Sequence, residues 1–341
     1  MIPADGEPQK LVHRIEEAML DSLPGKKQTY SSWRSQTEAL QQILHRCRRV
    51  AMQYSPRCAI PYVSMVDAGT VELVSSFGVE VVSSADLVQY FEARWTEAKL
   101  AAHLRAAAIV DEVRDKAFRL VAEKLSTGDT TTEWEIKNFI LEQFCKRGLV
   151  TEHGPIVAVN ENASDPHYEP QQDRHRPIRR GDVLLIDLWA KLDEPGAVYY
   201  DITWTAYCGR EAPSEVENVF DAVRGARDAA VAYVQKAVDE GDPLRGFEVD
   251  DVARRFIYER GYGEYFIHRT GHSIGEDVHG TGANMDNFET HDERRIIPWT
   301  CFSVEPGIYL PRFGVRSEVN VFVGEHEARV TGEVQPRLLL L

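Results

Sequence analysis

The sequence has few cysteines and no long apolar segment. Its five cysteines are scattered and never form a CxxC pair, which favours free thiols in a reducing compartment and argues against a cysteine-ligated zinc site. No run approaches the ~18 apolar residues that a membrane span needs. The first residues also lack the basic-then-apolar pattern of a secretory signal. We therefore expect a cytoplasmic protein with no membrane partner.

Positive charge is also scarce. The 341 residues include 39 Lys and Arg but 54 Asp and Glu, so the formal net charge is −15. Phosphate binding needs clustered Lys and Arg, so we expect no nucleic-acid partner. Hydrophobic residues make up 43% of the chain, which indicates a globular protein. The length is enough for two domains and a sizeable core.

Residues 1–94 have the pattern of a small α/β domain with no catalytic cluster. Short apolar runs predict strands, and longer segments with helical periodicity lie between them. The domain looks short at its start. The predicted strands are 10–15, 48–54 and 79–84, and the predicted helices are 31–47 and 66–78.

Residues 95–341 show one order of elements twice. A long helical pattern from Trp95 to Leu125 ends at Gly128, and a second helix begins at a capping box of Thr132 and Glu135. Strand-like segments follow. Another helix then starts at a capping box that we assign to Ser214 and Glu217. A shorter helix and more strands come after it, which indicates an internal duplication at the level of topology.

Four acids stand inside apolar strand-like segments. Buried carboxylates are costly unless they are paired or bind metal. Along residues 201–207, alternation places the odd-numbered residues, which are polar, on one face. The same argument applies to residues 316–320. The acids are Asp187 in VLLIDLWA, Asp201 in YYDITWTA, Glu305 in FSVEPGIYL and Glu318 in VRSEVNVFV.

A fifth candidate ligand lies in HRTGHSIGEDVHG, residues 268–280, which holds three histidines and three glycines. Four carboxylates and one imidazole suit a pair of divalent cations. Oxygen-rich ligands favour Mn²⁺, Mg²⁺ or a similar ion over a thiolate-type zinc site. Two such ions ~3.5–4 Å apart can share a water and lower its pKa.

These residues resemble a known family. Five motifs occur in the same order along the chain as in the creatinase and methionine aminopeptidase-like metallopeptidases. They are Asp187, DIT at 201–203, GHSIGEDVH at 271–279, EPG at 305–307 and VRSE at 315–318. The nearest branch is the proline-specific one, aminopeptidase P and prolidase. The resemblance covers roughly residues 95–335. It implies an α+β chain whose catalytic domain has the pita-bread fold, two αα-ββ halves related by a pseudo-twofold axis, after a small α/β domain.

The resemblance also implies a ligand set. Asp187 would bind one metal ion, Asp201 and Glu318 would bridge two, and His272 and Glu305 would complete the second. Glu305 would also move a proton from the attacking water to the leaving amine. The implied cofactor is two divalent ions, Mn²⁺ first, with Co²⁺ or Zn²⁺ as alternatives.

The remaining roles belong to groups around the metals. His279 would contact the substrate carbonyl, and His167 in SDPHYEP would stabilise the developing oxyanion. His268 would line the pocket for proline, and Arg316 would bind substrate. Simpler interpretations stay open: His167 as a surface residue, His268 as a satisfied structural histidine, and Arg316 as an ion-pair partner of Glu318.

The chain departs from the family pattern at three places. Trp204 replaces a usual Arg, but alternation points it away from the metals, so we expect altered packing only. The connection between Asp187 and Asp201 is longer than usual, because of a turn at DEPGAV. Asn320 replaces a frequent acid and could alter metal affinity.

The expected function is hydrolysis of the bond before proline, as in aminopeptidase P. Prolidase, which acts on dipeptides, is the alternative. Metal-free creatinase-like hydrolysis and a non-catalytic binding module are more distant alternatives, since both can dispense with the ligands that this chain retains. The partner would be a small proline-containing peptide. The family's N-terminal domain supports dimers, so a homodimer is expected.

Overall fold

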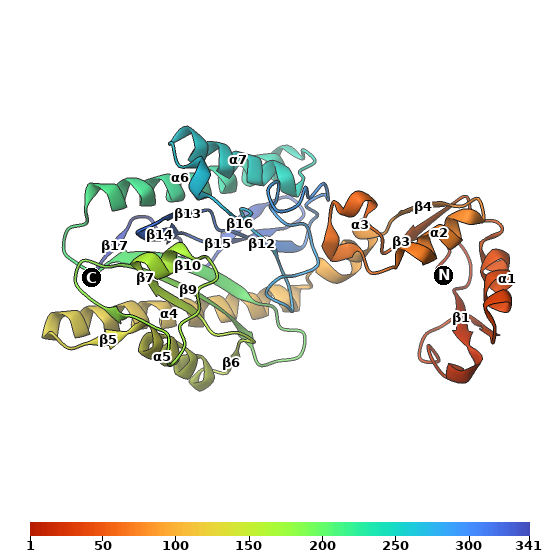
Figure 1. The fold of residues 1–341 in the computed structure, drawn as a ribbon, viewed down its shortest axis with the longest axis horizontal. Coiled ribbons are helices and arrows are strands. Elements are labelled where there is room, and N and C mark those ends of the chain that lie inside the picture. The colour runs from red at the N-terminus through yellow and green to blue at the C-terminus, as the bar shows by residue number, and fades with distance from the viewer. The chain divides into compact units, whose positions relative to one another are not determined.

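The computed structural model describes all 341 residues, which divide into two compact units, Met1–Ala85 and Asp86–Leu341 (Figure 1). The sequence pattern had suggested a boundary at residue 94. The segment between the two positions consists of α3 (Ala85–Val88) and one π-helical turn. Gln89 holds this segment against the rest of the second unit, because its side chain hydrogen-bonds with the backbone of Ala283 and Arg295.

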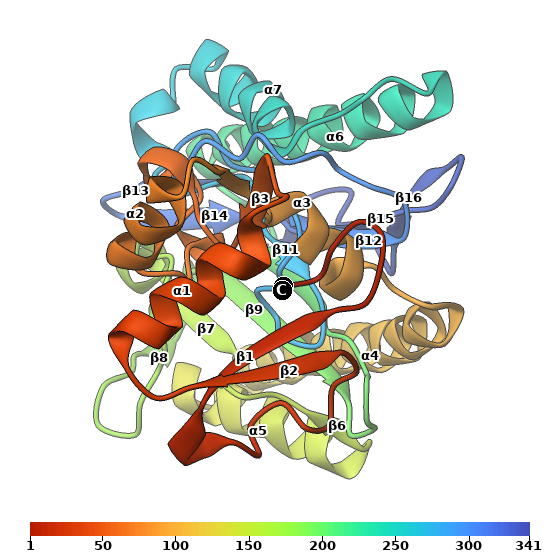
Figure 2. The ribbon, with the colours of Figure 1, turned by 90° about the vertical axis from the view of Figure 1, so that its right-hand side faces the viewer.

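The first unit contains two pairs of parallel strands. The three strands and both helices that the sequence predicts are confirmed, and one further strand, KKQTY, is exposed and polar, so no apolar pattern marks it. A small core of Leu44, Val74 and Val79 joins the helices to the second strand pair. The pairs are β1 (Gln9–His13) with β2 (Lys26–Tyr30), visible in Figure 2, and β3 (Arg49–Met52) with β4 (Glu80–Ser83); the helices are α1 (Trp33–Leu44) and α2 (Ala68–Ser76).

The second unit has the predicted order of helix, helix and strands, twice over. Its first half comprises α4 (Glu97–Thr127), β5 (Thr131–Thr132), α5 (Glu133–Lys146), β6 (Leu149–Val150), β7 (Ile156–Val159), β8 (Pro177–Ile178), β9 (Val183–Leu192) and β10 (Tyr200–Tyr207). The second half comprises α6 (Ser214–Glu240), α7 (Gly246–Glu259), β11 (Ser273–Ile274), β12 (Thr300–Val304), β13 (Gly307–Leu310), β14 (Phe313–Arg316), β15 (Val319–Val323) and β16 (Ala328–Thr331). The last strand is β17 (Leu339–Leu340), which pairs with β10.

The strands of the second unit lie between two pairs of helices (Figure 1). In one half, α4 and α5 pack on the sheet of β9 and β10; in the other, α6 and α7 cover the sheet of β12 and β15. The long helix α4 has a helical stripe of small apolar side chains, which lets it pack closely on the sheet. Its fully buried residues include Ala106, Val110, Val113, Ala117 and Val121.

Most of the predicted helix ends are confirmed. Gly128 follows α4 with a φ of 77°, a left-handed conformation that favours glycine, and Thr132 and Glu135 form the predicted capping box of α5. The predicted capping box at Ser214 is wrong. Pro213 occupies the N-cap position there, so Ser214 is already helical and caps nothing.

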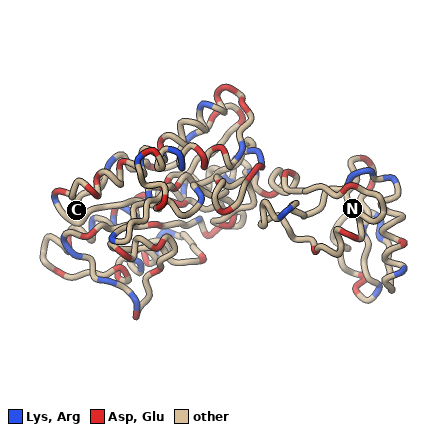
Figure 3. The backbone as a smooth tube through the Cα atoms, turned by 45° about the horizontal axis from the view of Figure 1, so that its top comes forward, with Lys and Arg blue, Asp and Glu red and all other residues tan.

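No helix of the structure combines the length and apolar character that a membrane span requires. Figure 3 shows Lys and Arg distributed among Asp and Glu along both units rather than gathered in one region.

Candidate metal centre and active site

The hairpin of β9 and β10 places two aspartates on one face of a sheet. In the antiparallel register, Asp187 lies opposite Thr203 and Asp201 lies opposite Trp189. Directly opposed residues share a face, so Asp187 and Asp201 are diagonal neighbours there. The turn after β9 includes Gly196 with a φ of 74° and keeps this pairing in register, as the sequence analysis expected for the longer connection.

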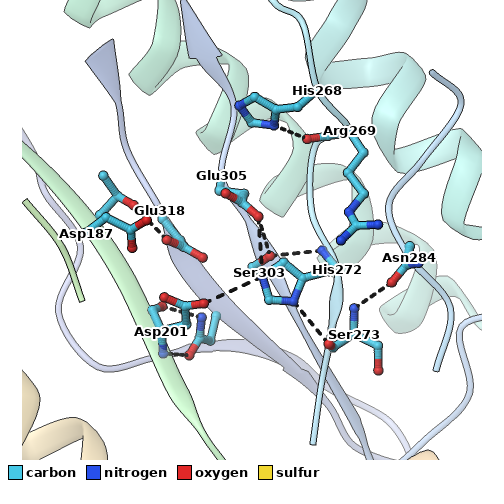
Figure 4. Close-up of polar contacts among 12 residues, drawn as sticks. Asp187, Asp201, His268, Arg269, His272, Ser273, Asn284, Ser303, Glu305 and Glu318 are labelled. Carbon is cyan, nitrogen blue, oxygen red and sulfur yellow. Dashed lines mark hydrogen bonds and ion pairs between the residues drawn. The ribbon is translucent and has the colours of Figure 1, made fainter. Parts of the chain in front are cut away.

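The second half contributes a histidine and two glutamates to the same place (Figure 4). His272 Nε2 lies 3.6 Å from an Asp201 oxygen and 3.4 Å from a Glu305 oxygen. Ser303 supports this arrangement, because its hydroxyl accepts from the His272 backbone N–H at 3.0 Å and lies 3.2 Å from Glu305. Gly271 permits the close approach: a Cβ there would lie 1.8 Å from the Ser303 carbonyl oxygen.

The residues fit a divalent metal site. Potential ligand atoms of Asp201, His272 and Glu318 lie within 4.8 Å of one another, and all three residues are buried. One oxygen on each of Asp187, Asp201 and Glu318 is buried without any hydrogen-bond partner. Buried carboxylate oxygens are almost always satisfied, and a coordinated cation is the partner that acidic oxygens at this spacing accept.

Burial and mutual repulsion raise the pKa of all four acids. Burial raises the pKa of Asp187 to about 6, with a smaller contribution from Asp201, while the Arg316 charge opposes the rise. The pKa values of Asp201 and Glu318 lie well above the ordinary range, first because of burial and then because of neighbouring carboxylates. Burial also raises the pKa of Glu305. The site thus concentrates negative charge that needs a cationic partner.

Arg316 is the buried cation that the protein itself supplies. Its Nη2 donates to Asp187 at 2.5 Å, and its Nε lies 3.8 Å from Glu305. The ion pair that the sequence suggested with Glu318 is therefore formed with Asp187 instead. Arg316 is 3% exposed, and its guanidinium also donates to the hydroxyl oxygens of Thr203 and Tyr309. Binding of substrate by Arg316 remains a proposal.

The three histidines of residues 268–280 have different surroundings. His268 hydrogen-bonds through Nε2 with the Tyr309 hydroxyl at 2.7 Å, and burial lowers its pKa to about 3. His272 lies among the acids, and burial lowers its pKa. The centroids of the His279 and His272 rings are 4.3 Å apart, and repulsion by His272 is the main reason that the pKa of His279 falls to about 3. Only His272 is within ligand distance of the acids.

His167 lies in the loop between β7 and β8 and its side chain is exposed. The backbone of this loop reaches the site, since the Pro166 carbonyl oxygen accepts from Arg316 Nη1 at 3.5 Å. The predicted metal ligands, together with Arg316 and His279, thus lie together, and His167 borders them on a separate loop. Their catalytic roles remain predictions.

Two of the departures from the family pattern have a structural explanation. Trp204 points away from the acids, as expected, and stacks on the Arg114 guanidinium at 3.8 Å from the ring centroid. Asn320 is turned toward β10, where its side chain hydrogen-bonds with both the N–H and the C=O of Asp201. It therefore fixes the backbone of a candidate ligand, a function that the sequence alone did not reveal.

Two hydroxyl groups that orient the acids are not among the residues that the sequence pattern predicts for the site. Thr203 donates to Glu318 at 2.8 Å and accepts from Arg316. Tyr309 joins His268 to Arg316, and burial raises its pKa to about 12. Alternation had placed Thr203 on the face of Asp201, which was a usable signal. Tyr309 had no comparable signal, because an aromatic residue in a strand is ordinarily part of the core.

Comparison with known proteins identifies a family. The model of metallopeptidase family M24 matches residues 101–325. A protein named as a putative Xaa-Pro aminopeptidase of Mycoplasma pneumoniae is 31% identical over 203 residues, covering 58% of this chain and 52% of that protein. An Xaa-Pro dipeptidase of Lactobacillus delbrueckii is 33% identical over 211 residues, covering 61% and 52%. The matched region thus spans about half the length of these relatives.

The solved structures extend the similarity to almost the whole chain. Dipeptidase PepE from Mycobacterium ulcerans superposes with a TM-score of 0.69 at 25% identity, covering 99% of this chain and 85% of that one. A prolidase from Thermococcus sibiricus gives a TM-score of 0.63, also at 25% identity, over 99% and 85%. Together with the observed order of elements, these matches confirm the pita-bread fold and the small α/β domain before it.

Proposed function

The chain belongs to metallopeptidase family M24, and from this premise we propose that it hydrolyses peptide bonds that precede proline. The observation that carries the proposal is the cluster of four carboxylates and one imidazole, in which Asp187, Asp201 and Glu318 each have one buried oxygen without a hydrogen-bond partner. A cluster of this composition needs cations to be stable, because burying several like charges together is costly.

In this proposal, two divalent ions would be held by Asp187, Asp201, His272, Glu305 and Glu318. When bound, such a pair supplies Lewis-acid polarisation and a water whose pKa is lowered toward neutrality. The predominance of oxygen donors and the single imidazole support Mn²⁺ over a thiolate-preferring ion, with Co²⁺ or Zn²⁺ as alternatives.

The protein's own groups would then handle the proton and the developing charge. Glu305 is placed to accept a proton from the attacking water and deliver it to the leaving nitrogen, because it borders His272 without a strong hydrogen bond of its own. His279 would contact the scissile carbonyl, and His167 would donate to the oxyanion. His268 and Tyr309 would form a wall of the proline pocket. Arg316 would hold Asp187 and face the substrate.

The bond before proline needs a specialised peptidase. The ring of proline fixes φ, and its nitrogen carries no hydrogen, so peptidases that require a backbone N–H at this position fail. We favour an activity like that of aminopeptidase P. An Xaa-Pro dipeptidase is the second candidate, supported by the names of relatives that match equally well.

We further propose that the protein acts in the cytoplasm as a homodimer. All five cysteines are free, which suits a reducing compartment. The dimer follows from the resemblance to the proline-specific branch. Analytical sedimentation of the purified protein tests the dimer directly.

Hydrolysis of Ala-Pro beside Ala-Pro-Ala, in the presence of Mn²⁺, tests the function. Release of alanine from the tripeptide, abolished by a chelator, is the expected result. Cleavage of the dipeptide alone would identify a dipeptidase. Failure to cleave either peptide, with Mn²⁺ bound, would contradict the proposal. Ala-Ala-Ala serves as the control peptide that should stay intact.

A further inference from the structure

Glu133 is a fully buried carboxylate outside the cluster of acids. It is the first residue of α5, and its side chain is 0% exposed. It accepts hydrogen bonds from the Val159 and Arg176 backbone N–H groups, each at 2.7 Å. The Asn162 amide donates at 2.9 and 3.0 Å, and the Tyr168 hydroxyl donates at 2.7 Å. These donors are neutral, so the charge is stabilised by hydrogen bonds and by the N-terminus of the helix.

The donors to Glu133 span the segment that carries His167. Val159 ends β7, and Asn162 follows in the 3-10 turn that opens the loop. Tyr168 is the neighbour of His167, and Arg176 stands directly before β8. One carboxylate therefore holds the entry, the middle and the exit of residues 160–176. A loop needs such anchors, because its backbone is not held by a regular hydrogen-bond ladder.

A second residue of α5 holds the same loop. Lys137, one helical turn after Glu133, donates to Glu169 at 2.5 Å and to the Pro170 carbonyl at 3.1 Å. Its side chain is 8% exposed. The loop also rests on the second half of the unit, since the Ser164 hydroxyl donates to the Leu310 carbonyl at 2.5 Å.

We propose that Glu133 is a positioning residue that sets the place of His167 at the active site. This inference rests on the proposed function, in which His167 donates to the oxyanion. Donors of this kind act only when they are fixed in advance at the place where charge develops. The His167 side chain is exposed and has few contacts to hold it, so its position depends on the backbone of the loop and on Tyr168 beside it.

Glu133→Gln is the first test. It keeps the shape of the side chain but turns an NH₂ group toward donors, and at least one of the present hydrogen bonds is lost. We expect kcat to fall roughly 10- to 100-fold, since a misplacement of about 1 Å has an effect of that size. KM should change less than about threefold, because an interaction made mainly in the transition state is lost. Glu135→Gln, two residues along the same helix, removes the same charge without touching the loop and should retain full kcat.

The same substitution made in a His167→Ala variant distinguishes a positioning role of Glu133 from a general loss of structure. If Glu133 acts through His167, Glu133→Gln should have no further effect on kcat in that background, within about twofold. An equal fall of kcat in both backgrounds would overturn the proposal. Tyr168→Phe provides a milder second variant in case Glu133→Gln does not fold. It removes one donor beside His167, and its smaller loss of kcat should vanish in the same background.

Hydrogen exchange read by mass spectrometry tests the positioning without any activity. Amides of residues 159–176 should exchange faster in Glu133→Gln than in Glu135→Gln, while α6 should be unchanged. Unchanged exchange in this segment would overturn the proposal. If the unmodified protein cleaves no Xaa-Pro peptide, the proposed function fails on its own, and the exchange result alone decides whether Glu133 orders the loop.

Discussion

The side chain of Asn320 hydrogen-bonds with the backbone of Asp201 at both the N–H, 3.0 Å, and the C=O, 2.6 Å. These residues come from the two halves of the second unit, one in β15 and one in β10. The pair therefore joins the halves at the candidate metal centre. It also fixes the backbone from which the Asp201 carboxylate projects, and Thr205 has a similar partner in Gln335.

Asn320→Ala should weaken metal binding as well as the fold. Two buried backbone groups would lose their partner, which typically lowers the free energy of unfolding by about 1–3 kcal/mol. Loss of a group that orients a ligand typically reduces metal affinity about 10- to 100-fold. Calorimetric titration with Mn²⁺ measures the second effect. Gln335→Ala is the matched control, because it removes the same kind of contact at Thr205 and should leave the affinity nearly unchanged.

His279 and His272 should respond differently to replacement by alanine. His272 lies within 3.6 Å of two acids, so His272→Ala should lose metal and activity together. His279→Ala should keep its metal but lose kcat by about 10²-fold, the usual effect of removing a group that stabilises the transition state. Metal content and kcat are measured on the same samples. Loss of metal from His279→Ala would mean that His279 is a metal ligand and that its assignment as a substrate contact is wrong.

Trp204→Ala should affect stability and leave the metals alone. Trp204 is 9% exposed, and its indole lies against Arg114, on the far side of β10 from the acids. Truncation of a large buried aromatic side chain costs about 3–5 kcal/mol of the free energy of unfolding. Urea unfolding measures this loss, and Trp204→Phe should retain most of the stability. A large fall in Mn²⁺ affinity for either variant would contradict the assignment of Trp204 to packing.

The histidine His103 should make the fold sensitive to acid. Burial lowers its pKa from 6.5 to about 4, and it bridges the Tyr199 carbonyl and the Thr331 hydroxyl. The unfolded chain therefore binds the proton more readily than the folded one. This contribution to stability is complete above pH 6.5 and is lost as the pH falls toward 4.

The shift corresponds to about 3 kcal/mol, at 1.36 kcal/mol for each pKa unit. Urea unfolding at several pH values, with a chelator present throughout, measures it without interference from metal release. His103→Gln should show a shallower decline of stability between pH 7 and 4.5 than the unmodified protein. Parallel curves for the two proteins would contradict the role assigned to His103.

The sequence predicted the candidate ligands better than the groups around them. Acids inside apolar strands are conspicuous because burial makes them costly, so Asp187 stands out in its apolar run, and Asp201 stands out both for this reason and by alternation. Tyr309 and Asn320 have ordinary places in strands, and their partners come from distant segments. Only the folded chain brings Tyr309 to His268, or Asn320 to the backbone of Asp201.

Local sequence signals likewise predicted some features of the fold correctly and others wrongly. The capping box at Thr132 and the glycine after α4 depend on neighbouring residues, so they could be predicted. The same Ser-x-x-Glu pattern at Ser214 failed, since the preceding Pro213 already occupies the cap. The buried Glu133 had no local signal either: its donors lie 26 to 43 residues further along the chain.

The number of Mn²⁺ ions bound per chain is the measurement that tests the metal centre most directly. Equilibrium dialysis of the unmodified protein should give two ions for each chain. Asp201→Asn, which removes a proposed bridging ligand, should bind at most one ion and lose turnover while circular dichroism stays unchanged. Asp193→Asn, an exposed neighbour on the same hairpin, is the control and should bind two. A folded unmodified protein that binds no Mn²⁺, Co²⁺ or Zn²⁺, or an Asp201→Asn variant with full occupancy and activity, would contradict the account.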